Sequence, residues 1–324
     1  MGGLPRRNHT IAEWKNKGEA LVLDVGSSLA PRAAPEPWVD RPDALELRRT
    51  KARLIAESFA SAGIDGMALG AADWKLGRDF VMALAETNNL PVLASNLTCE
   101  DASPFLGSRV IEVSGRRIGV AGFTDGAPEG CVATDPVAAL RGELRSMGTL
   151  DLAIALAPTR DAEVLVPIGS LGFDVVLDGR GRHSTGSPQR YGNAWFYGAG
   201  IRGKHLGVMN VGFRPKGRGV APVMEPGRLE RDMDRLNRDL AAASTALETA
   251  ADPSRRLRLE AQRSSTEERL KELLRLRKAS EDDGVHTLAY LEVALTDDVP
   301  DDVETRARIE AAQVPPEIVR QGRY

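Results

Sequence analysis

Two arginines and a histidine follow a buried-strand pattern in the stretch FDVVLDGRGRHST, residues 173–185. The apolar run ends in Asp178 and a glycine, which is a typical strand end. Side chains just beyond the carboxyl end of such a strand lie where α/β proteins bind ligands. Because arginine matches phosphate bidentately, Arg180 and Arg182, with His183 beside them, could hold a small anion there.

The composition bounds the kinds of protein that could carry such a site. The chain has 324 residues, 42% of them hydrophobic, which is enough for one or two domains. A formal net charge of −3 argues against a dedicated nucleic-acid binder. No run approaches the roughly 18 apolar residues of a membrane span, and residues 1–10 hold no apolar stretch typical of a signal peptide.

The only two cysteines are Cys99 and Cys131. Two are too few for a disulfide scaffold and too few for a zinc site of their own. We expect both to be buried structural residues, as free cysteine commonly is. As unpaired residues they would not indicate whether the protein resides in an oxidising or a reducing compartment.

Strand and helix patterns alternate along most of the chain. Apolar or β-branched runs predict strands at 20–26, within 63–77, and at 90–97, 108–123, 150–158, 173–178, 193–213 and 286–295. Helical spacing or capping residues predict helices at 43–62, 78–86, 135–147, 161–171 and 300–313. The run 108–123 contains Ser-Gly at its centre and predicts a β-hairpin. These alternations favour an α/β domain with a mixed sheet or a sheet sandwich.

Between residues 229 and 250 the apolar side chains recur with alternating spacings of four and three, the a/d seam of a coiled coil. They are Leu229, Met233, Leu236, Leu240, Ala243, Leu247 and Ala250. A short Asp-Pro turn at 251–254 follows, and a second charged helix runs to about residue 278. We expect an antiparallel helical hairpin, with a single amphipathic segment packed on the main domain as the alternative.

Eight segments in this order resemble the calcineurin-like metallophosphoesterases, and among them the exported 5'-nucleotidase and UDP-sugar hydrolase branch. The segments are GGLPRR (2–7), LVLDVGSSL (21–29), KARLIAESFASAGIDGMALGAADWKLG (51–77), LPVLASNL (90–97), GRRIGVAGFTD (115–125), DLAIALAPTRD (151–161), FDVVLDGRGRHS (173–184) and GAGIRGKHLGVMNV (198–211). The resemblance implies an α/β (α+β) fold, a metallophosphoesterase-like β-sandwich flanked by helices with the helical hairpin inserted. The implied division is a main domain at 1–225, the hairpin at 226–282, and a returning strand with a C-terminal helix at 283–324.

The family's chemistry needs two adjacent divalent metals, which hold a phosphate and deliver a hydroxide in line. This chain departs from the family's ligand pattern at each motif. The family's first Asp-x-His would precede residue 1, and Ser27 stands in place of the bridging Asp. Ala71 and Ala72 replace the Asn and His of Gly-Asn-His-Glu, and Pro158 replaces a lone His.

Arg180 and Arg182 stand where the family has the two histidines of Gly-His-x-His. A neutral imidazole donates a lone pair to a metal, whereas arginine has none and keeps its positive charge. We therefore predict that the dinuclear metal centre is lost and that no metal cofactor is used. A divalent metal such as Mn or Zn, held in another way, is the alternative.

Two roles remain open for the cationic side chains that follow the 173–178 strand. They bind a small anion, or, as we favour, they pair with polar groups of the chain itself inside the emptied pocket. The groups that complete the pocket in either case are Asp24, Ser27, Asp73, Asn96 and Asp178. Asn96 follows a strand, where an asparagine side chain more often satisfies backbone groups than binds a ligand.

Two functions of different class follow. The first is a non-catalytic binding or scaffold module, with the helices at 228–278 contacting a protein partner or a second copy of the chain. The alternative is a divalent-metal-dependent phosphoester or nucleotide hydrolase with a non-standard site, formed by Asp24, Asp73, Asp178 and His183. The resemblance implies a periplasmic or otherwise extracytoplasmic protein, whereas a chain complete as written, without a signal peptide, would stay in the cytoplasm.

Overall fold

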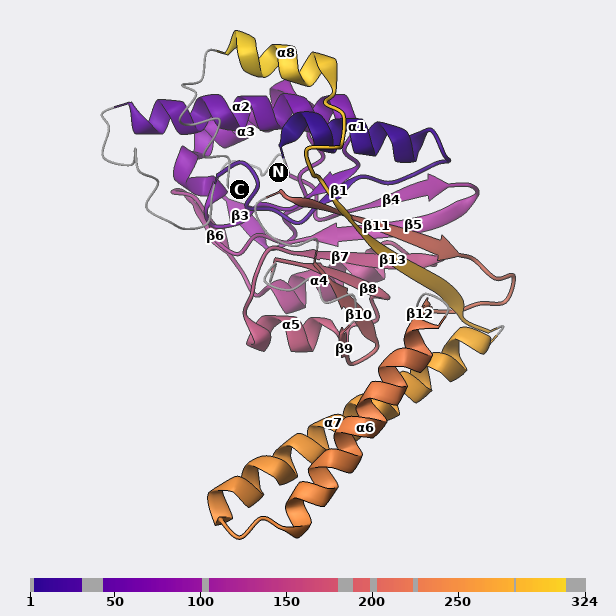
Figure 1. Ribbon diagram of the computed structural model, residues 1–324. Helices are drawn as coiled ribbons and strands as arrows, with labels where there is room; N and C mark the ends of the chain where they lie inside the picture. Colours follow the sequence, from indigo (N-terminus) through magenta and orange to yellow (C-terminus); the bar gives the residue numbers. More distant parts are fainter. Residues whose placement is uncertain are drawn as a thin grey trace. The chain divides into compact units, whose positions relative to one another are not determined.

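The computed structural model describes residues 3–30, 43–100, 105–179, 189–198, 203–223, 227–282 and 284–312. The chain divides into two compact units. The first holds Met1–Val208 with Glu292–Tyr324, and the second holds Met209–Leu291. Figure 1 labels the helices and strands of both.

A six-stranded mixed sheet forms the centre of the first unit. In sheet order its strands are β4 (Ser108–Val113), β5 (Arg116–Gly122), β7 (Leu152–Ala157), β8 (Val175–Asp178), β10 (Ala194–Tyr197) and β9 (Gln189–Tyr191). The inner strands are parallel to one another, and β4 and β9 are antiparallel to their neighbours. Parallel strands buried on both faces are continuous apolar runs, and every residue of LAIALA in β7 is buried.

β4 and β5 form the predicted hairpin, which the strand register confirms. Ser114 and Gly115 join them with φ values of 50° and 71°. Positive φ at both central residues is the condition for a type I′ turn, whose twist matches that of the flanking strands. The Ser-Gly pair was therefore a local sequence signal that sufficed to predict the hairpin.

Helices α4 (Pro136–Ser146) and α5 (Ala162–Ile168) pack against each other, and α4 contacts β5. α4 begins as predicted, because the Asp135 carboxylate accepts two backbone N–H groups of the first turn and Pro136 occupies the first helical position. The two helices and the sheet share one apolar core, which includes the fully buried Phe123.

The other elements of the first unit are short strands and helices. They are α1 (Leu4–Lys15), β1 (Leu23–Asp24), α2 (Ala44–Ala62), β2 (Gly66–Met67), η1 (Asp73–Leu76), α3 (Arg78–Thr87), β3 (Leu97–Cys99), β6 (Cys131–Ala133) and α8 (Val303–Ala311). β1 pairs with β2 in parallel, and β3 pairs with β6 in antiparallel. The strand predicted within 63–77 is much shorter than its apolar pattern, because the chain turns early into the glycine-containing loop before η1. The strand predicted at 90–97 is reduced to single bridges at Val92 and Leu93, and β3 begins only at Leu97.

Helix α1 is not predicted by the sequence patterns, and its buried face explains why. Two of its buried residues, Asn8 and Thr10, are polar, so the helix lacks an apolar stripe. Asn8 Nδ2 donates to the Ser58 carbonyl oxygen at 3.1 Å and to Thr305 Oγ1 at 3.0 Å. These bonds join α1 to α2 and α8, which lie together in Figure 1.

The second unit contains β12 (Val220–Val223), α6 (Arg228–Glu248), α7 (Pro253–Glu281), the second half of β11 (His205–Gly212) and most of β13 (His286–Ala294). β13 lies between β11 and β12 in a three-stranded sheet and runs parallel to β12. In sequence the two helices fall between β12 and β13 of this sheet. They pack side by side, and α7 also contacts β12.

The apolar seam of α6 is covered by α7. Leu236 and Ala243 of the seam are buried, and the other seam residues are half-buried. On α7, Leu273 and Leu276 are buried in return. Among the residues that the structure describes, no helix combines the length and the apolarity needed to cross a membrane.

Candidate functional site

The loops that follow β1 and β2 lie directly against each other. A Cβ atom on Gly26 would come within 2.9 Å of the Ala68 carbonyl oxygen, and a Cβ on Gly70 would lie 1.8 Å from Ser27 Oγ. Ser27 has a φ of 58°, a left-handed conformation that costs a non-glycine residue roughly 1–2 kcal/mol. This closely packed corner is where the resemblance places the family's bridging Asp and its Gly-Asn-His-Glu motif.

Replacing Gly70 tests how closely this corner is packed. We expect Gly70→Ala to lower the free energy of unfolding by about 2 kcal/mol, because the new methyl group overlaps Ser27 Oγ. In a Ser27→Gly background, which removes the hydroxymethyl group, most of that loss should disappear. Urea unfolding of the two single variants and the double variant measures the coupling, and equal losses in both backgrounds would show that the contact is absent.

Asp73 is fully buried at the start of η1 and holds the β1 loop in place. One carboxyl oxygen accepts the backbone N–H groups of Ser27 and Gly70, both at 2.8 Å. The other accepts those of Leu29 and Ala30, both at 3.0 Å. A carboxylate has about four acceptor positions, and four backbone donors fill them. Asp73 is therefore a structural acceptor whose lone pairs are already used.

The pKa of Asp73 is raised to about 7, chiefly because burial disfavours its charged form. The backbone N–H groups oppose this shift, and the charge of Asp24 adds to it. The folded chain then binds a proton that the unfolded chain releases near pH 4, so this group's contribution to stability is complete below pH 4 and is lost as the pH rises through 7.

We expect a measurable consequence between pH 4 and pH 8. The free energy of unfolding of the wild type should fall by about 1 kcal/mol or more beyond the fall seen for Asp73→Asn, which has no titrating group at this position. Urea unfolding at several pH values measures the difference. Parallel pH curves for the two proteins would contradict the raised pKa.

Asp24 ends β1 beside this loop and is half-buried. Ser28 Oγ lies 2.8 and 2.9 Å from its two carboxyl oxygens and donates to them, and the Gly26 N–H donates at 2.9 Å. Burial raises the pKa of Asp24, and the charge of Arg7 partly offsets that. Burial in turn lowers the pKa of Arg7 to about 10. The internal partners of Asp24 are thus a neighbouring hydroxyl, a backbone N–H and a cation from α1.

Asn96 uses its whole side chain to hold both ends of one segment, residues 124–134. Its Nδ2 donates to the carbonyl oxygens of Thr124 at 3.0 Å and Thr134 at 3.1 Å, and its Oδ1 accepts the Thr124 N–H at 2.9 Å. Asn96 is 2% exposed. The expectation that it satisfies backbone groups at a strand end is confirmed.

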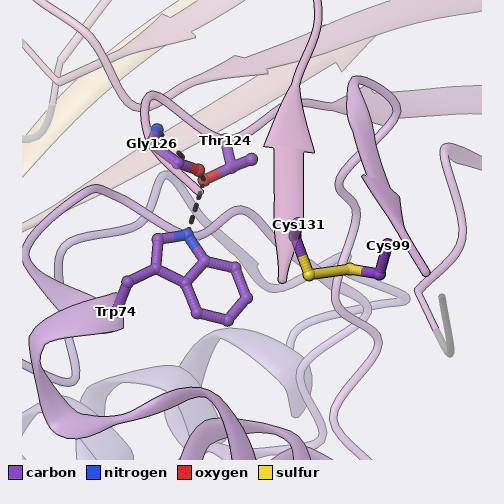
Figure 2. The surroundings of a disulfide bond; sticks show 5 residues. All are labelled: Trp74, Cys99, Thr124, Gly126 and Cys131. Carbon is purple, nitrogen blue, oxygen red and sulfur yellow. Dashed lines mark hydrogen bonds between the residues drawn. A yellow bond between two sulfur atoms is a disulfide. The ribbon is translucent and has the colours of Figure 1, made fainter. Parts of the chain in front are cut away.

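The 124–134 segment also contacts η1 and the loop before it. Trp74 Nε1 donates to Thr124 Oγ1 at 2.9 Å, and that hydroxyl donates to the Gly126 carbonyl oxygen at 2.7 Å (Figure 2). The exposed Asp125 carboxylate accepts the N–H of Ala71. A Cβ on Gly126 would lie 2.9 Å from Ala71 Cβ, so the segment rests closely on the position where the family has its ligand asparagine.

Asp125 is a site residue that the sequence patterns did not single out. It follows β5 and precedes a glycine, the same pattern of strand and Asp-Gly that drew attention to Asp178. Asp178 itself ends β8, is buried, and lies opposite Ala157 of β7. Arg180, Arg182 and His183 lie outside the described residues.

Cys99 and Cys131 form a disulfide bond, which corrects the expectation that both are unpaired bystanders. The antiparallel pairing of β3 with β6 places the two cysteines directly opposite each other, 32 positions apart in the chain. Figure 2 shows the bond beside the Trp74–Thr124 contact. Counting cysteines could not reveal this pair, since it depends on the register of two strands far apart in sequence.

Two of the polar side chains described at this corner, Asp73 and Asn96, are bonded to backbone groups and not free to ligate a divalent cation. Both oxygens of Asp73 accept backbone N–H groups, and the amide of Asn96 is bonded to the backbone on both atoms. Within the described ranges, no group of three or more His, Cys, Asp or Glu side chains is placed to hold a metal ion. Asp73 and Asn96 therefore hold the loops of this corner together.

Several solved structures share this fold. The sulfate thiohydrolase SoxB of Thermus thermophilus aligns with a TM-score of 0.64 at 16% identity, over 98% of this chain and 48% of that one. A 5'-nucleotidase precursor, also from Thermus thermophilus, aligns with a TM-score of 0.60 at 15% identity, over 99% and 54%. The NAD nucleotidase NadN of Haemophilus influenzae aligns with a TM-score of 0.54 at 16% identity, over 69% and 45%.

These alignments establish the class of fold. The chain has the mixed α/β fold of the calcineurin-like metallophosphoesterases and 5'-nucleotidases, as the sequence resemblance implied. It spans about half the length of the three solved structures. No protein-family model matches the chain, and no curated protein matches it in sequence.

Proposed function

We propose that this chain is a non-catalytic binding or scaffold module on a 5'-nucleotidase-like metallophosphoesterase fold. The observation that carries the proposal is the bonding of Asp73, whose two carboxyl oxygens accept four backbone N–H groups. In the family that the sequence resembles, the same loops supply metal ligands. Here their remaining polar side chains are engaged by the chain itself.

The former active site is the candidate binding pocket of this module. Its ligand would be a small anion, held by Arg180, Arg182 and His183 at the carboxyl end of β8. Arginine is suited to this because it presents a planar, permanently charged fork to a phosphate or carboxylate. Asp178, two positions before Arg180, ends β8 and is buried.

The helical hairpin, assigned to 226–282 in the proposed division of the chain, is the candidate protein-contact element. The α6 seam packs on α7, so a partner or a second copy would have to contact the outer faces of the hairpin. Those faces carry many charged side chains, including the Arg263–Glu267 and Lys271–Glu268 pairs. A contact of this kind would be sensitive to salt.

The disulfide supports a location outside the cytoplasm. Bonds such as Cys99–Cys131 persist in secreted and periplasmic proteins and are rare where thiol reductants are abundant. We therefore place the functional chain in an oxidising compartment. This agrees with the exported branch that the sequence resembles.

A phosphoester assay tests the proposal. The purified chain, supplied with manganese and a generic phosphoester or nucleotide, should release no phosphate above the buffer control. The matched control is a preparation of an active metallophosphoesterase under the same conditions. Sustained turnover that is removed by a chelator and restored by manganese would overturn the non-catalytic reading in favour of a hydrolase with a non-standard site.

A further inference from the structure

The 124–134 segment is held mainly by a few specific contacts, because it buries little apolar surface. Most of its residues from Asp125 onward are exposed, and the apolar residue Val132 is among them at 64% exposure. Its strand β6 is three residues long and pairs only with β3, which is also three residues long. A two-stranded ribbon of this size is marginal without additional support.

The disulfide supplies that support within the segment. Asn96 bonds to Thr124 and Thr134 and so fixes the two ends. Cys131 lies between these ends and is covalently joined to Cys99, which is itself three residues beyond Asn96. Both cysteines are half-buried, so the bond is partly open to small reagents.

The segment in turn covers the loop before η1. Asp125 accepts the Ala71 N–H, Gly126 packs on Ala71, and Thr124 accepts the indole N–H of Trp74. Movement of the segment would uncover this loop at the rim of the candidate site. The position of the segment therefore decides how open that rim is.

We infer that the Cys99–Cys131 disulfide is a redox-sensitive cross-link that keeps the 124–134 segment packed over Ala71. Reduction of the bond by a dithiol releases the segment. One thiolate of the reductant attacks a cysteine sulfur, the S–S bond breaks, and the other cysteine leaves as a thiolate and takes up a proton. The second thiol of the reductant then displaces the first cysteine, which is protonated in its turn. Two electrons pass to the protein, and the reductant leaves as its cyclic disulfide.

This inference concerns access to the site and holds whether or not the site is catalytic. Breaking the bond removes the one covalent restraint on the segment, while Asn96 still holds its ends. We therefore expect local opening rather than global unfolding. The strands of the central sheet, which are joined by continuous parallel pairing, should still exchange more slowly than this segment.

Hydrogen exchange of the full chain, with and without dithiothreitol, tests this. In the reduced protein we expect the amides of Ala71 and of 124–134 to exchange about tenfold faster or more than in the oxidised protein, and to do so while β7 (Leu152–Ala157) is still protected. Mass shifts after alkylation confirm that both thiols are free. The double variant Cys99→Ser/Cys131→Ser should show the same exchange rates as the reduced protein, and dithiothreitol should not change them.

Three results would overturn the inference. The first is equal protection of 124–134 in the oxidised and reduced chains. The second is exchange of β7 at the same rate as 124–134 in the reduced chain, because the segment would then open only when the whole unit unfolds. The third is a bond that resists millimolar dithiothreitol while the chain stays folded, as titration of free thiols would reveal.

Discussion

Asp73→Asn should destabilise the protein by about 3 kcal/mol at pH 8, above the raised pKa of about 7 of the Asp73 carboxyl group, since each buried N–H group left without an acceptor costs about 1–3 kcal/mol. The amide matches the carboxyl group in size but replaces one acceptor oxygen with an NH₂ donor. Whichever way it turns, two backbone N–H groups then face a donor, those of Ser27 and Gly70 or those of Leu29 and Ala30. Chemical denaturation measures the loss of free energy of unfolding.

Asp135→Asn is the matched control for this experiment. Asp135 also accepts two backbone N–H groups, at 3.1 Å each, but it does so at the exposed start of α4. Asparagine is as good an N-cap as aspartate, so we expect a change within about 0.5 kcal/mol. Similar small effects of both substitutions would show that Asp73 is not the buried acceptor described here.

Removing the disulfide is the second change with a large expected effect. The bond joins residues 32 positions apart, and closing a loop of that length should stabilise the fold by about 3.5 kcal/mol in the chain-entropy account. We expect Cys99→Ser/Cys131→Ser to lower the free energy of unfolding by that order. Urea unfolding of the variant beside the oxidised wild type measures it.

The reduced wild-type protein is the control that separates the bond from the substitutions. It should unfold at the same urea concentration as the double serine variant, because both lack only the cross-link. If the reduced wild type is as stable as the oxidised protein, the bond contributes nothing. A variant less stable than the reduced wild type would instead point to serine hydroxyls that are poorly accommodated beside the core.

Several elements could be predicted from the sequence because their signals are local. The Ser-Gly turn of the β4–β5 hairpin and the Asp-Pro start of α4 each depend on the conformations of two adjacent residues. The continuous apolar run of β7 likewise reports burial on both faces of a parallel sheet. The order of such elements favoured an α/β domain, and the resemblance of eight segments to a known family implied the particular fold.

Other features depend on contacts between distant residues and left no local signal. Helix α1 buries Asn8 against α2 and α8, so no apolar stripe marks it. The partner of Cys99 is set by the register of β3 with β6. Such features could be read only once the strands and helices were placed in space.

The structure brings together part of the residue set predicted for the site, but with different bonding partners. Asp24, Ser27 and Asp73 come together, and Asn96 joins them through Thr124 and Trp74. The sequence favours arginines as partners of Asp73 and could not show that its carboxyl group turns toward backbone N–H groups. That Arg180, Arg182 and His183 form an anion pocket stays a prediction.

The loss of the dinuclear metal centre is the central claim, and metal stoichiometry tests it most directly. The purified full chain should be incubated with excess manganese, freed of unbound ion and analysed for metal by mass spectrometry. We predict no stoichiometric manganese, because the carboxyl and amide groups at the corner of β1, β2 and η1 are already bonded within the chain. A stoichiometric pair of manganese ions retained by each chain would contradict that account.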